Sequence, residues 1–485
     1  MTILAGSATL KSPMTKPSVP SLQHTNYEHA LHRVIGLADY ERVAGIGSPL
    51  LKKDLSRMRE LARRIGNPQC TIPVIHVTGT KGKGSTASMI SSILVAAEYR
   101  VGLFTSPHLH TFRERIRVDG ESLSEQGFVN AVDRIWPHVE AMAGDYVDGA
   151  PTTFELLTAM AFDLVLSERI DILVLEVGMG GRLDSTNVAD ATVDVITSIS
   201  LDHTAILGGT VELIAGEKAG IIKAATPTVV APQIYPTVLQ VISERARTMG
   251  APVVEIGRDV KYDILNHNLT GQTIGIETSR KYYSVRIPLL GAHQAGNAAA
   301  AIAAVEAFDP QIAPEVMGRG LLGVRWDGRF QVLEEGPPAV VVDGAHNPQS
   351  MGVLCEAVRD YLNPSGTVAI FGCSGDKELM GTAERLASIA THVVVCTSRH
   401  PRAVPPERVE SVFNELGIPT SRAATVGCAM DLARTIASPS SAIVVTGSLF
   451  VVAEALEAWH GIEPERYPEL ERPQEDRAET VSGLG

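Results

Sequence analysis

Apolar and polar positions along this chain follow two alternating patterns, one typical of strands and one of helices. β-Branched and apolar runs predict strands at residues 72–77, 100–104, 171–176 and 193–199. Residues 154–167 place apolar side chains on most faces of a helix, which predicts a buried helix. Strands that alternate with helices favour a mostly parallel sheet, so the expected fold class is α/β.

A second alternating unit follows Gly336-Pro337-Pro338, a sequence typical of a linker. Its strands are expected at 339–342, 367–371, 392–396 and 442–445, and its helices at 349–362, 379–389, 406–415 and 451–459. Before the linker, residues 253–288 are rich in Thr, Tyr and Ile with polar alternation, which favours an antiparallel excursion.

These patterns predict two domains with a cleft between them, where ligands usually bind. We expect a larger domain at 21–335 and a smaller, doubly wound, Rossmann-like domain at 336–465. The Ser/Thr/Pro-rich residues 1–20 and the charged stretch from about Glu463 onward are typical of disordered tails, so the tails are expected at 1–20 and 466–485.

A glycine-rich loop connects the first predicted strand to a helix and reads HVTGTKGKGST over residues 76–86. Such a turn points backbone N–H groups and the positive end of a helix at one spot, which is an arrangement that binds phosphate. Lys83 would add a charge near the β- and γ-phosphates, and Ser85 or Thr86 a hydroxyl for Mg²⁺. The strict Walker pattern is not met, because Val77 stands at its first glycine and an extra glycine separates Lys83 from Ser85. A glycine turn that only caps a buried helix is the alternative.

Composition narrows the classes of function. At 485 residues the chain is too long for one hydrophobic core, and its 45% apolar and 20% charged residues are ordinary for a globular protein. A formal net charge of −13 without a dense Lys/Arg run argues against nucleic acid or an anionic membrane as the main partner. No apolar run approaches the about 20 residues that a membrane helix needs, and no signal peptide is visible. Five widely spaced cysteines argue against a disulfide framework or structural zinc and favour the cytoplasm.

Three polar side chains are considered next, of which the first two, Glu176 and His203, follow strands at the edge where open α/β sheets bind ligands. Glu176 ends the strand at 171–176, and a buried carboxylate beside a P-loop is a candidate Mg²⁺ ligand rather than a solvated strand-end acid. His203 follows the next strand, where a hydrogen-bonded structural histidine is the commoner role. Lys218 ends a helix before a strand at 228–231, and its spacing favours only an ordinary surface or helix-terminal lysine.

The second unit contributes two further candidates. Asp343, in the segment DGAHNP at 343–348, follows a strand and is placed either to accept a hydrogen bond from a ribose hydroxyl or to cap the next helix. Arg329, beside the linker, could reach a phosphate from the second domain or be solvated, as lone arginines near linkers usually are. The residue pattern alone leaves both pairs of alternatives open.

Ten short motifs in one order resemble the folylpolyglutamate synthase/dihydrofolate synthase family, within the Mur-ligase-like ATP-dependent amide ligases. They are GTKGKGST (79–86), TSPHL (105–109), RERI (113–116), TTFE (152–155), LEVGMGGRLDSTN (175–187), SLDHTAILG (200–208), EKAGIIK (217–223), GAHQAGNA (291–298), GR (328–329) and DGAHNP (343–348). Each motif is weak alone, but ten in this order are very specific. The family commonly has Asn where this chain has Lys81, and its P-loop contains the extra glycine seen here as Gly84.

The resemblance implies a role for each candidate. The ATP-binding residues would be Gly79, Thr80, Lys81, Gly82, Lys83, Gly84, Ser85, Thr86, Asn297, Arg329 and Asp343. The ligands of two Mg²⁺ ions would be Ser85, Glu176, His203 and Lys218, the last as a carbamate derived from CO₂. The pterin-bearing substrate would contact Thr152, Thr153, Phe154, Leu183, Asp184 and Ser185. The catalytic residues would be Lys83, Lys218 and His203, with His346 as a candidate general base.

The reaction implied by the resemblance joins L-glutamate to dihydropteroate, to reduced folates, or to both. ATP would convert the acceptor carboxylate into an acyl phosphate, because a carboxylate is a poor electrophile, and the neutral amine of glutamate would displace the phosphate. The second domain would close over the first and exclude water. The partners expected are these small molecules only, bound by a monomer.

Two alternatives remain at this stage. A Mur-type ligase acting on a UDP-muramoyl peptide is disfavoured by TSPHL, by Gly84 and by the presence of only about 70 residues before the P-loop. A nucleotide-dependent switch without catalysis would be favoured by loss of Glu176, His203 or Lys218, and all three are present.

Overall fold

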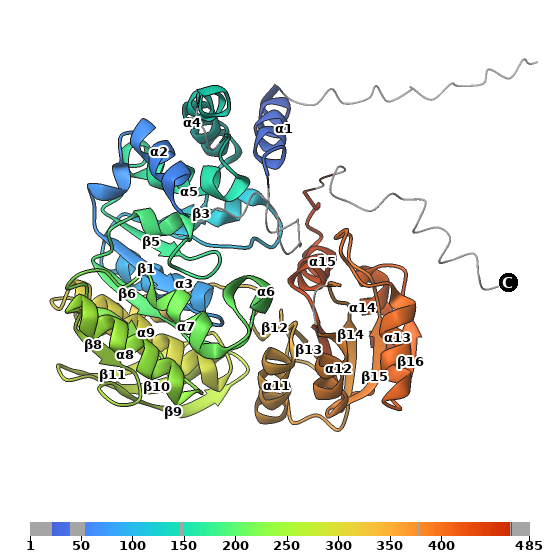
Figure 1. Cartoon of the computed structure of the whole chain (residues 1–485). Coiled ribbons are helices and arrows are strands. Elements are labelled where there is room, and N and C mark those ends of the chain that lie inside the picture. The colour runs from blue at the N-terminus through green and yellow to red at the C-terminus, as the bar shows by residue number, and fades with distance from the viewer. Residues whose placement is uncertain (1–21, 39–53, 146–148, 376–377, 466, 468–485) are drawn as a thin grey trace, which may run out of the picture.

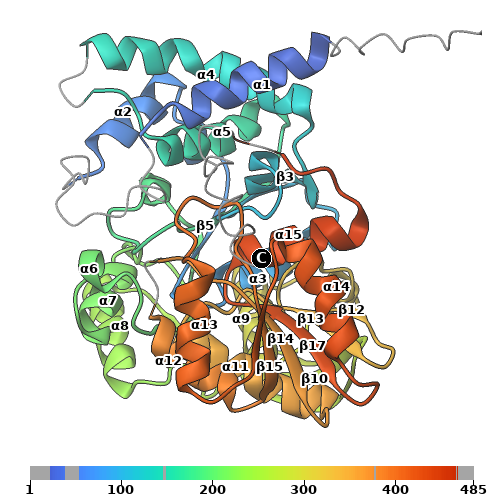
Figure 2. The ribbon, with the colours of Figure 1, turned by 90° about the vertical axis from the view of Figure 1, so that its right-hand side faces the viewer.

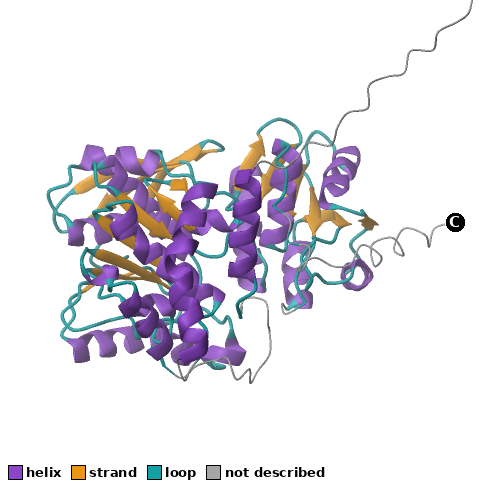
Figure 3. Ribbon diagram, turned by 90° about the horizontal axis from the view of Figure 1, so that it is seen from above, coloured by secondary structure: helices purple, strands orange, loops and turns teal. Residues whose placement is uncertain are grey.

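The computed structural model describes residues 22–38, 54–145, 149–375, 378–465 and 467, and the tail expected at 1–20 lies outside them. Figure 1 shows two α/β lobes side by side: an N-terminal lobe that contains α1 to α10 and a C-terminal lobe that contains β12 to α15. In both lobes helices cover both faces of a sheet (Figure 3). The predicted α/β fold class is confirmed.

The N-terminal lobe is built on an eight-stranded sheet. Strands β1, β2, β5, β6, β7 and β8 run parallel, and β3 and β4 are antiparallel additions at one edge. In spatial order the strands are β4 (Glu121–Ser122), β3 (Ile116–Val118), β2 (Val101–Phe104), β5 (Ile172–Glu176), β1 (Val74–Thr78), β6 (Val193–Ile196), β7 (Thr228–Val230) and β8 (Val253–Glu255). The four strands predicted in this part exist within a few residues, except that β6 ends at Ile196, because the residues after it bond to the glycine-rich loop instead.

Helices cover this sheet on both faces. The label η is used for short helical segments that are not α-helices. One core joins α3 (Lys83–Ala96), α9 (Ala292–Phe308) and α10 (Pro314–Leu322) to the sheet, so α3 is buried on nearly all sides. A second core joins α1 (Leu22–Ile35), α2 (Ser56–Arg64), α4 (Glu125–Asp145) and the predicted buried helix α5 (Thr153–Ser167). Smaller elements are η1 (Pro68–Cys70), η2 (Phe112–Arg115), η3 (Ser185–Val188), α6 (Thr204–Leu207), α7 (Val211–Ala219) and α8 (Pro236–Met249).

The predicted antiparallel excursion exists and is a separate three-stranded sheet. Its strands are β9 (Lys261–Asn268), β10 (Gly271–Glu277) and β11 (Tyr282–Ile287), paired in the order β11-β10-β9. The expected range of 253–288 is too wide at its start, because β8 pairs in parallel with β7 and belongs to the large sheet.

The C-terminal lobe is a six-stranded sheet in which only β12 is antiparallel. Its strands in spatial order are β12 (Gln331–Glu334), β13 (Ala339–Val342), β17 (Ala442–Thr446), β14 (Thr367–Phe371), β15 (Ala390–Val395) and β16 (Thr420–Arg422). Its helices are α11 (Pro348–Ala357), η4 (Val358–Leu362), α12 (Leu379–Ala387), α13 (Pro406–Glu415), α14 (Val426–Ile436) and α15 (Leu449–His460). The four predicted strands and four predicted helices exist. The sequence pattern missed β12 and β16, which are short, half-exposed edge strands, and α14.

The two lobes contact each other at several points. Tyr361 of the C-terminal lobe donates a hydrogen bond from Oη to Oε1 of Gln272 at 2.9 Å. Beyond α15 the chain returns to the N-terminal lobe as far as Tyr467, so the disorder predicted from about Glu463 is wrong at its start. Within the described ranges, no helix has the length and apolar character needed to cross a membrane.

Candidate active site

The glycine-rich loop lies at the carboxyl end of β1, and its glycines are required by close packing. Gly82 precedes α3 with a φ of 88°, a left-handed conformation that glycine adopts without strain. A Cβ at Gly82 would lie 2.6 Å from Oδ1 of Asn297. A Cβ at Gly84 would lie 2.5 Å from the Trp326 ring and 3.3 Å from Oε2 of Glu176. Gly84, the extra glycine of this loop, is therefore required because a side chain there would clash with Trp326.

The first half of the loop is fastened to the strand beside it. The backbone N–H groups of Thr80 and Lys81 donate to the carbonyl of Ser198 at 2.8 and 3.1 Å. The Thr80 hydroxyl donates to the Ser200 carbonyl at 3.1 Å. The first N–H groups of α3 have no acceptor within a helix. The amides that can receive a phosphate are therefore those of residues 82–85, which begin α3.

Glu176 ends β5 as predicted and is buried against the loop. Its side chain is 5% exposed, its Oε2 accepts the Ser106 N–H at 3.1 Å, and its Oε1 lies 4.0 Å from Nζ of Lys83. Burial raises the pKa of Glu176, although the charges of Lys83 and Arg329 and the Ser106 hydrogen bond act in the opposite direction. This buried carboxylate at the start of α3 suits a hard divalent cation.

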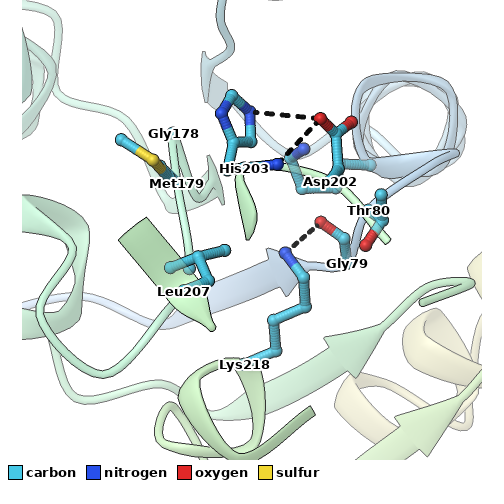
Figure 4. Close-up of a pocket in the computed structure, with 10 residues that line it drawn as sticks. Gly79, Thr80, Gly178, Met179, Asp202, His203, Leu207 and Lys218 are labelled. Atoms are coloured by element: carbon cyan, nitrogen blue, oxygen red, sulfur yellow. Dashed lines mark hydrogen bonds and ion pairs between the residues drawn. The ribbon is translucent and has the colours of Figure 1, made fainter. Parts of the chain in front are cut away.

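Lys83, His203 and Lys218 line one small pocket at this edge of the sheet, together with Gly79 and Asp202 (Figure 4). Lys218 lies in the last turn of α7 and donates from Nζ to the Gly79 carbonyl at 2.7 Å. Burial, followed by the charge of Lys83, lowers the pKa of Lys218 from 10.5 to about 7. The interpretation of Lys218 as an ordinary surface lysine, which its spacing favoured, is therefore wrong.

His203 occupies the first position before α6 with a φ of 51°, and 47% of its side chain is exposed. Its Nε2 lies 3.9 Å from Oδ1 of Asp202, whose carboxylate also accepts the His203 N–H at 3.0 Å. In Figure 4 the His203 ring lies beside the Asp202 carboxylate, and the Lys218 side chain points toward the Gly79 carbonyl from another element. The imidazole therefore lies beside the pocket and is held near the Asp202 carboxylate, an arrangement compatible with both the structural role and the metal-ligand role.

Mg²⁺ prefers oxygen atoms, so its first candidate ligands here are carboxylates and hydroxyls. Within the part of the chain that the structure describes, no three His, Cys, Asp or Glu side chains gather closely enough to hold a metal ion. Glu176 and the buried Ser85 both adjoin the start of α3, and Ser85 Oγ accepts a long hydrogen bond of 3.5 Å from Gln294. A carboxylate and a hydroxyl at a phosphate-binding loop fit Mg²⁺, which binds few protein ligands and uses substrate phosphates for others.

Two candidates come from the C-terminal lobe. Asp343 follows β13, and its carboxylate accepts the N–H groups of Phe330 and Ala345, both at 2.8 Å. It does not cap α11, because Asn347 occupies that position with a capping box. Arg329 donates to the Gly328 carbonyl at 3.0 Å, and burial lowers its pKa against the opposing charges of Asp343 and Glu176. Arg329 is thus attracted by a carboxylate of each lobe, Glu176 of the N-terminal lobe and Asp343 of the C-terminal lobe.

Lys81 links the two lobes. Its Nζ lies 3.0 Å from Oδ2 of Asp202 and 3.3 Å from Nε2 of His346. The other ring nitrogen of His346, Nδ1, lies 2.8 Å from the Gly344 carbonyl, which only accepts, so Nδ1 carries the proton. In this arrangement both ring nitrogens of His346 are engaged.

The two segments expected at the pterin-bearing substrate lie together. Phe154 in the first turn of α5 faces the Gly178 backbone, where a Cβ would lie 2.5 Å from its ring. The hydroxyls of Thr152 and Thr153 are used by the fold: the first caps α5 and the second donates to the Val34 carbonyl at 2.9 Å.

Asp184 begins η3 and is buried within its own loop, between the half-buried Leu183 and Ser185. Its carboxylate accepts the Met179 N–H at 3.0 Å, and the N–H and hydroxyl of Thr186 at 3.0 and 2.5 Å. Burial raises the pKa of Asp184, and these hydrogen bonds oppose that shift. The carboxylate therefore shapes the loop rather than pointing freely into a pocket.

Sequence reasoning did not single out several residues at this site. Asp202 and Gln294 lie inside quoted motifs, next to or near the candidates His203 and Asn297, so proximity within a motif was the available signal. Ser106 contacts Glu176 through its backbone N–H, and the Trp326 ring packs against Gly84. Neither contact is visible in a sequence pattern.

Comparison with protein families matches two models to this chain. Residues 77–305 match the Mur ligase middle domain, and residues 328–449 match the Mur ligase glutamate ligase domain. The P-loop, Glu176, Lys218 and Asn297 fall in the first match, and Arg329 and Asp343 fall in the second.

Individual relatives are also similar over most of this chain. A dihydrofolate synthase/folylpolyglutamate synthase of Bacillus subtilis is 40% identical over 362 residues, which cover 73% of this chain and 83% of that protein. The structure of Mycobacterium tuberculosis folylpolyglutamate synthase complexed with ADP and AMPPCP is similar with a TM-score of 0.81 at 31% identity, covering 91% of this chain and all of that one. Escherichia coli FolC in complex with DHPP and ADP has a TM-score of 0.77 at 29% identity, covering 92% and 99% of the two chains.

Proposed function

Because the chain belongs to the folylpolyglutamate synthase/dihydrofolate synthase family of Mur-type ligases, we propose that it joins L-glutamate to the carboxylate of a folate-type acceptor, with ATP converted to ADP and phosphate. The observation that carries this proposal is the meeting of Lys83, His203 and Lys218 in one pocket beside the buried Glu176. These are the residues that the family resemblance selects, and they come from four separate segments of the chain.

The N-terminal lobe would bind and polarise the phosphates of ATP. The amides of residues 82–85 at the start of α3 would hold the β- and γ-phosphates, and the Lys83 ammonium would neutralise charge on the phosphoryl group in transfer. Arg329 and Asp343 would hold the nucleotide from the C-terminal lobe, the arginine on phosphate and the aspartate on ribose. Catalysis would rest on positioning and electrostatic stabilisation, as is usual in phosphoryl transfer.

Two Mg²⁺ ions would be held by Ser85, Glu176, His203 and Lys218 as its carbamate, and they would supply positive charge to the phosphates. Carbamate formation needs a neutral amine that attacks CO₂ and releases a proton. The buried Lys218, whose pKa is lowered to about 7, supplies such an amine near neutral pH, whereas an ordinary lysine is almost fully protonated. The modification would also remove a buried positive charge beside Lys83.

The acceptor would lie between the loop at 178–185 and the start of α5, where Phe154 and Asp184 shape the wall. Its carboxylate would become an acyl phosphate, and the neutral amine of glutamate would attack the acyl carbon while phosphate leaves. The proton of the amine needs a base. His346 can serve only when Lys81 leaves its Nε2, because that nitrogen holds the one lone pair of this tautomer.

The Mur-type UDP-muramoyl ligase is the weaker alternative, since the relatives that match most of the chain carry folate names. We further propose that the protein acts as a monomer in the cytoplasm. The presence of five free thiols is compatible with that compartment.

The experiment that tests this proposal measures phosphate release that depends on ATP, Mg²⁺ and L-glutamate. Dihydropteroate and tetrahydrofolate are assayed in parallel as acceptors. Turnover with both acceptors identifies a bifunctional enzyme, and turnover with one names the branch. No turnover with either, but turnover with a UDP-muramoyl peptide, would replace the proposal by its alternative. Omission of glutamate is the control, because phosphate release should then fall to the background of ATP hydrolysis.

A further inference from the structure

The loop that joins β2 to β3, taken together with the first residue of β3, covers residues 105–116 and is a compact unit here named the bridging loop. The Glu114 carboxylate accepts the backbone N–H groups of Leu109, His110 and Thr111 at 2.9, 2.7 and 2.8 Å. At its first end the Ser106 N–H donates to the Glu176 carboxylate at 3.1 Å. A displacement of this loop would therefore move a hydrogen bond on a candidate Mg²⁺ ligand.

The bridging loop also reaches into the C-terminal lobe. Leu109 packs against one of the apolar cores of that lobe, which is formed by β13, β14, β15, β17, α14 and α15. The neighbouring His110 places Nδ1 3.3 Å from Oε1 of Glu457 in α15, and Glu457 in turn lies 2.6 Å from Nη2 of Arg399. One loop of the N-terminal lobe is thus seated in the other lobe.

The chain beyond α15 makes the reciprocal contact, and its residues 463–465 and 467 are here named the clasp. Glu465 accepts the Tyr27 hydroxyl of α1 at 2.5 Å on Oε1, and the Phe112 N–H of the bridging loop at 3.3 Å on Oε2. The Tyr467 hydroxyl also donates to Glu465, and the Tyr467 ring meets the Phe112 ring edge-on with centroids 5.5 Å apart. Figure 2 shows this end of the chain running from α15 along the N-terminal lobe.

We propose that Glu465 and Tyr467 are positioning residues for the ligase reaction. They fix Phe112, and with it the bridging loop, from outside the substrate pocket. The carboxylate of Glu465 receives hydrogen bonds from three donors on different segments, and hydrogen bonds to a charged acceptor are the stronger kind. Phe112 is 2% exposed and packs into the core of the N-terminal lobe, and the Tyr467 ring covers it from the clasp. Loss of the clasp would remove that contact and leave Phe112 less firmly held.

The consequence reaches the active site through Ser106 and through the seating of the two lobes. Loss of the clasp should loosen the loop that donates to Glu176, and so raise the Mg²⁺ concentration required. The loop also begins directly after Phe104, whose ring centroid lies 5.6 Å from that of Phe154 at the proposed acceptor wall, so the KM for the folate acceptor should rise as well. The P-loop makes its own contacts with residues 198–200, so the KM for ATP should change little. The kinetic part of this inference rests on the proposed ligase function, whereas the loop motion does not.

The experiment compares E465A and Y467A with the control E463A in the full-length protein, because Glu463 is an exposed glutamate of the same segment. Hydrogen exchange of residues 105–116 is measured by mass spectrometry, together with the KM values for acceptor and ATP and the Mg²⁺ dependence. Two conservative variants are included: E465Q keeps an acceptor oxygen, and Y467F keeps the aromatic ring.

We expect about tenfold faster exchange in the bridging loop and an about tenfold higher acceptor KM for E465A and Y467A, the size expected for loss of hydrogen bonds to a charged group. The conservative variants should fall between these and E463A. If exchange or acceptor KM matches E463A in both alanine variants, the positioning role is refuted. An inactive wild type with faster exchange in E465A would refute the ligase function while leaving the clasp supported. If an alanine variant does not fold, E465Q and Y467F decide by the same two readouts.

Discussion

The clearest test of the site concerns Lys218 and its shifted pKa. With a pKa of about 7, about half of the Lys218 side chains carry a neutral amine at pH 7, whereas a lysine with the ordinary pKa of 10.5 is about 0.03% neutral. The population able to react with CO₂ is therefore larger by about three orders of magnitude. Because the amine loses its proton as pH rises through about 7, carbamate formation and activity at low bicarbonate should rise over the same range.

The assay combines ¹³C NMR with kinetics. Protein in ¹³C-bicarbonate and Mg²⁺ should show a carbamate signal that is missing in K218R, whose guanidinium keeps the charge but cannot form a carbamate. K218A should lose turnover, and added short carboxylic acids should restore part of it by supplying the missing carboxylate. Wild-type protein without the ¹³C signal, together with an active K218R, would refute the carbamate. K223R is a matched control, since Lys223 lies five residues away and bonds to the Ala189 and Asn187 carbonyls instead.

Four further outcomes can be measured directly. Lys83→Ala should abolish turnover and leave the circular dichroism spectrum unchanged, and full activity would contradict the P-loop assignment. Gly84→Ala should weaken ATP binding, because its Cβ would lie 2.5 Å from Trp326, whereas Gly216→Ala in α7, with nothing within 4 Å, should bind ATP normally in a nucleotide titration. Asp184→Ala should raise the KM for the pterin-bearing acceptor more than that for ATP, because it frees the loop at Met179, and the reverse order would place the pocket elsewhere. Arg57→Ala should lower the free energy of unfolding by about 3 kcal/mol in urea, because it leaves a buried carboxylate at the start of α5 without its partner at 2.6 Å.

The fold could be predicted where apolar runs coincide with buried strands. Strands β1, β5, β13 and β14 are buried along most of their length, so their sequences are nearly continuous apolar runs, and their positions were predicted within two residues. The strand β16 reads Thr-Ser-Arg, because an edge strand that is half exposed needs no apolar residues, and it was missed. Short edge strands are stabilised by pairing rather than by their own composition.

The site could be predicted only in part from residue patterns. The glycine-rich loop could be singled out as a candidate phosphate-binding loop because its glycines and lysine act through local geometry, which spacing preserves. Lys218 was not, because its unusual pKa comes from burial and from the charge of Lys83, a residue 135 positions away in the sequence. Only the family resemblance selected it. Asp343 was left between two roles, and the structure removed one of them by placing the helix cap at Asn347.

The buried charges of the site explain why these residues fit a highly charged ligand. The pKa of Glu176 is raised, and the pKa values of Lys218 and Arg329 are lowered, in each case with burial as the largest cause. All three shifts favour the neutral forms, so the protein alone solvates these charges less well than water does. ATP phosphates would bring negative charge to the two cations, and Mg²⁺ positive charge to the carboxylate. A ligand that binds only the folded chain stabilises it by mass action. The same groups that weaken the fold at this edge of the sheet are therefore those through which ATP and Mg²⁺ would strengthen it.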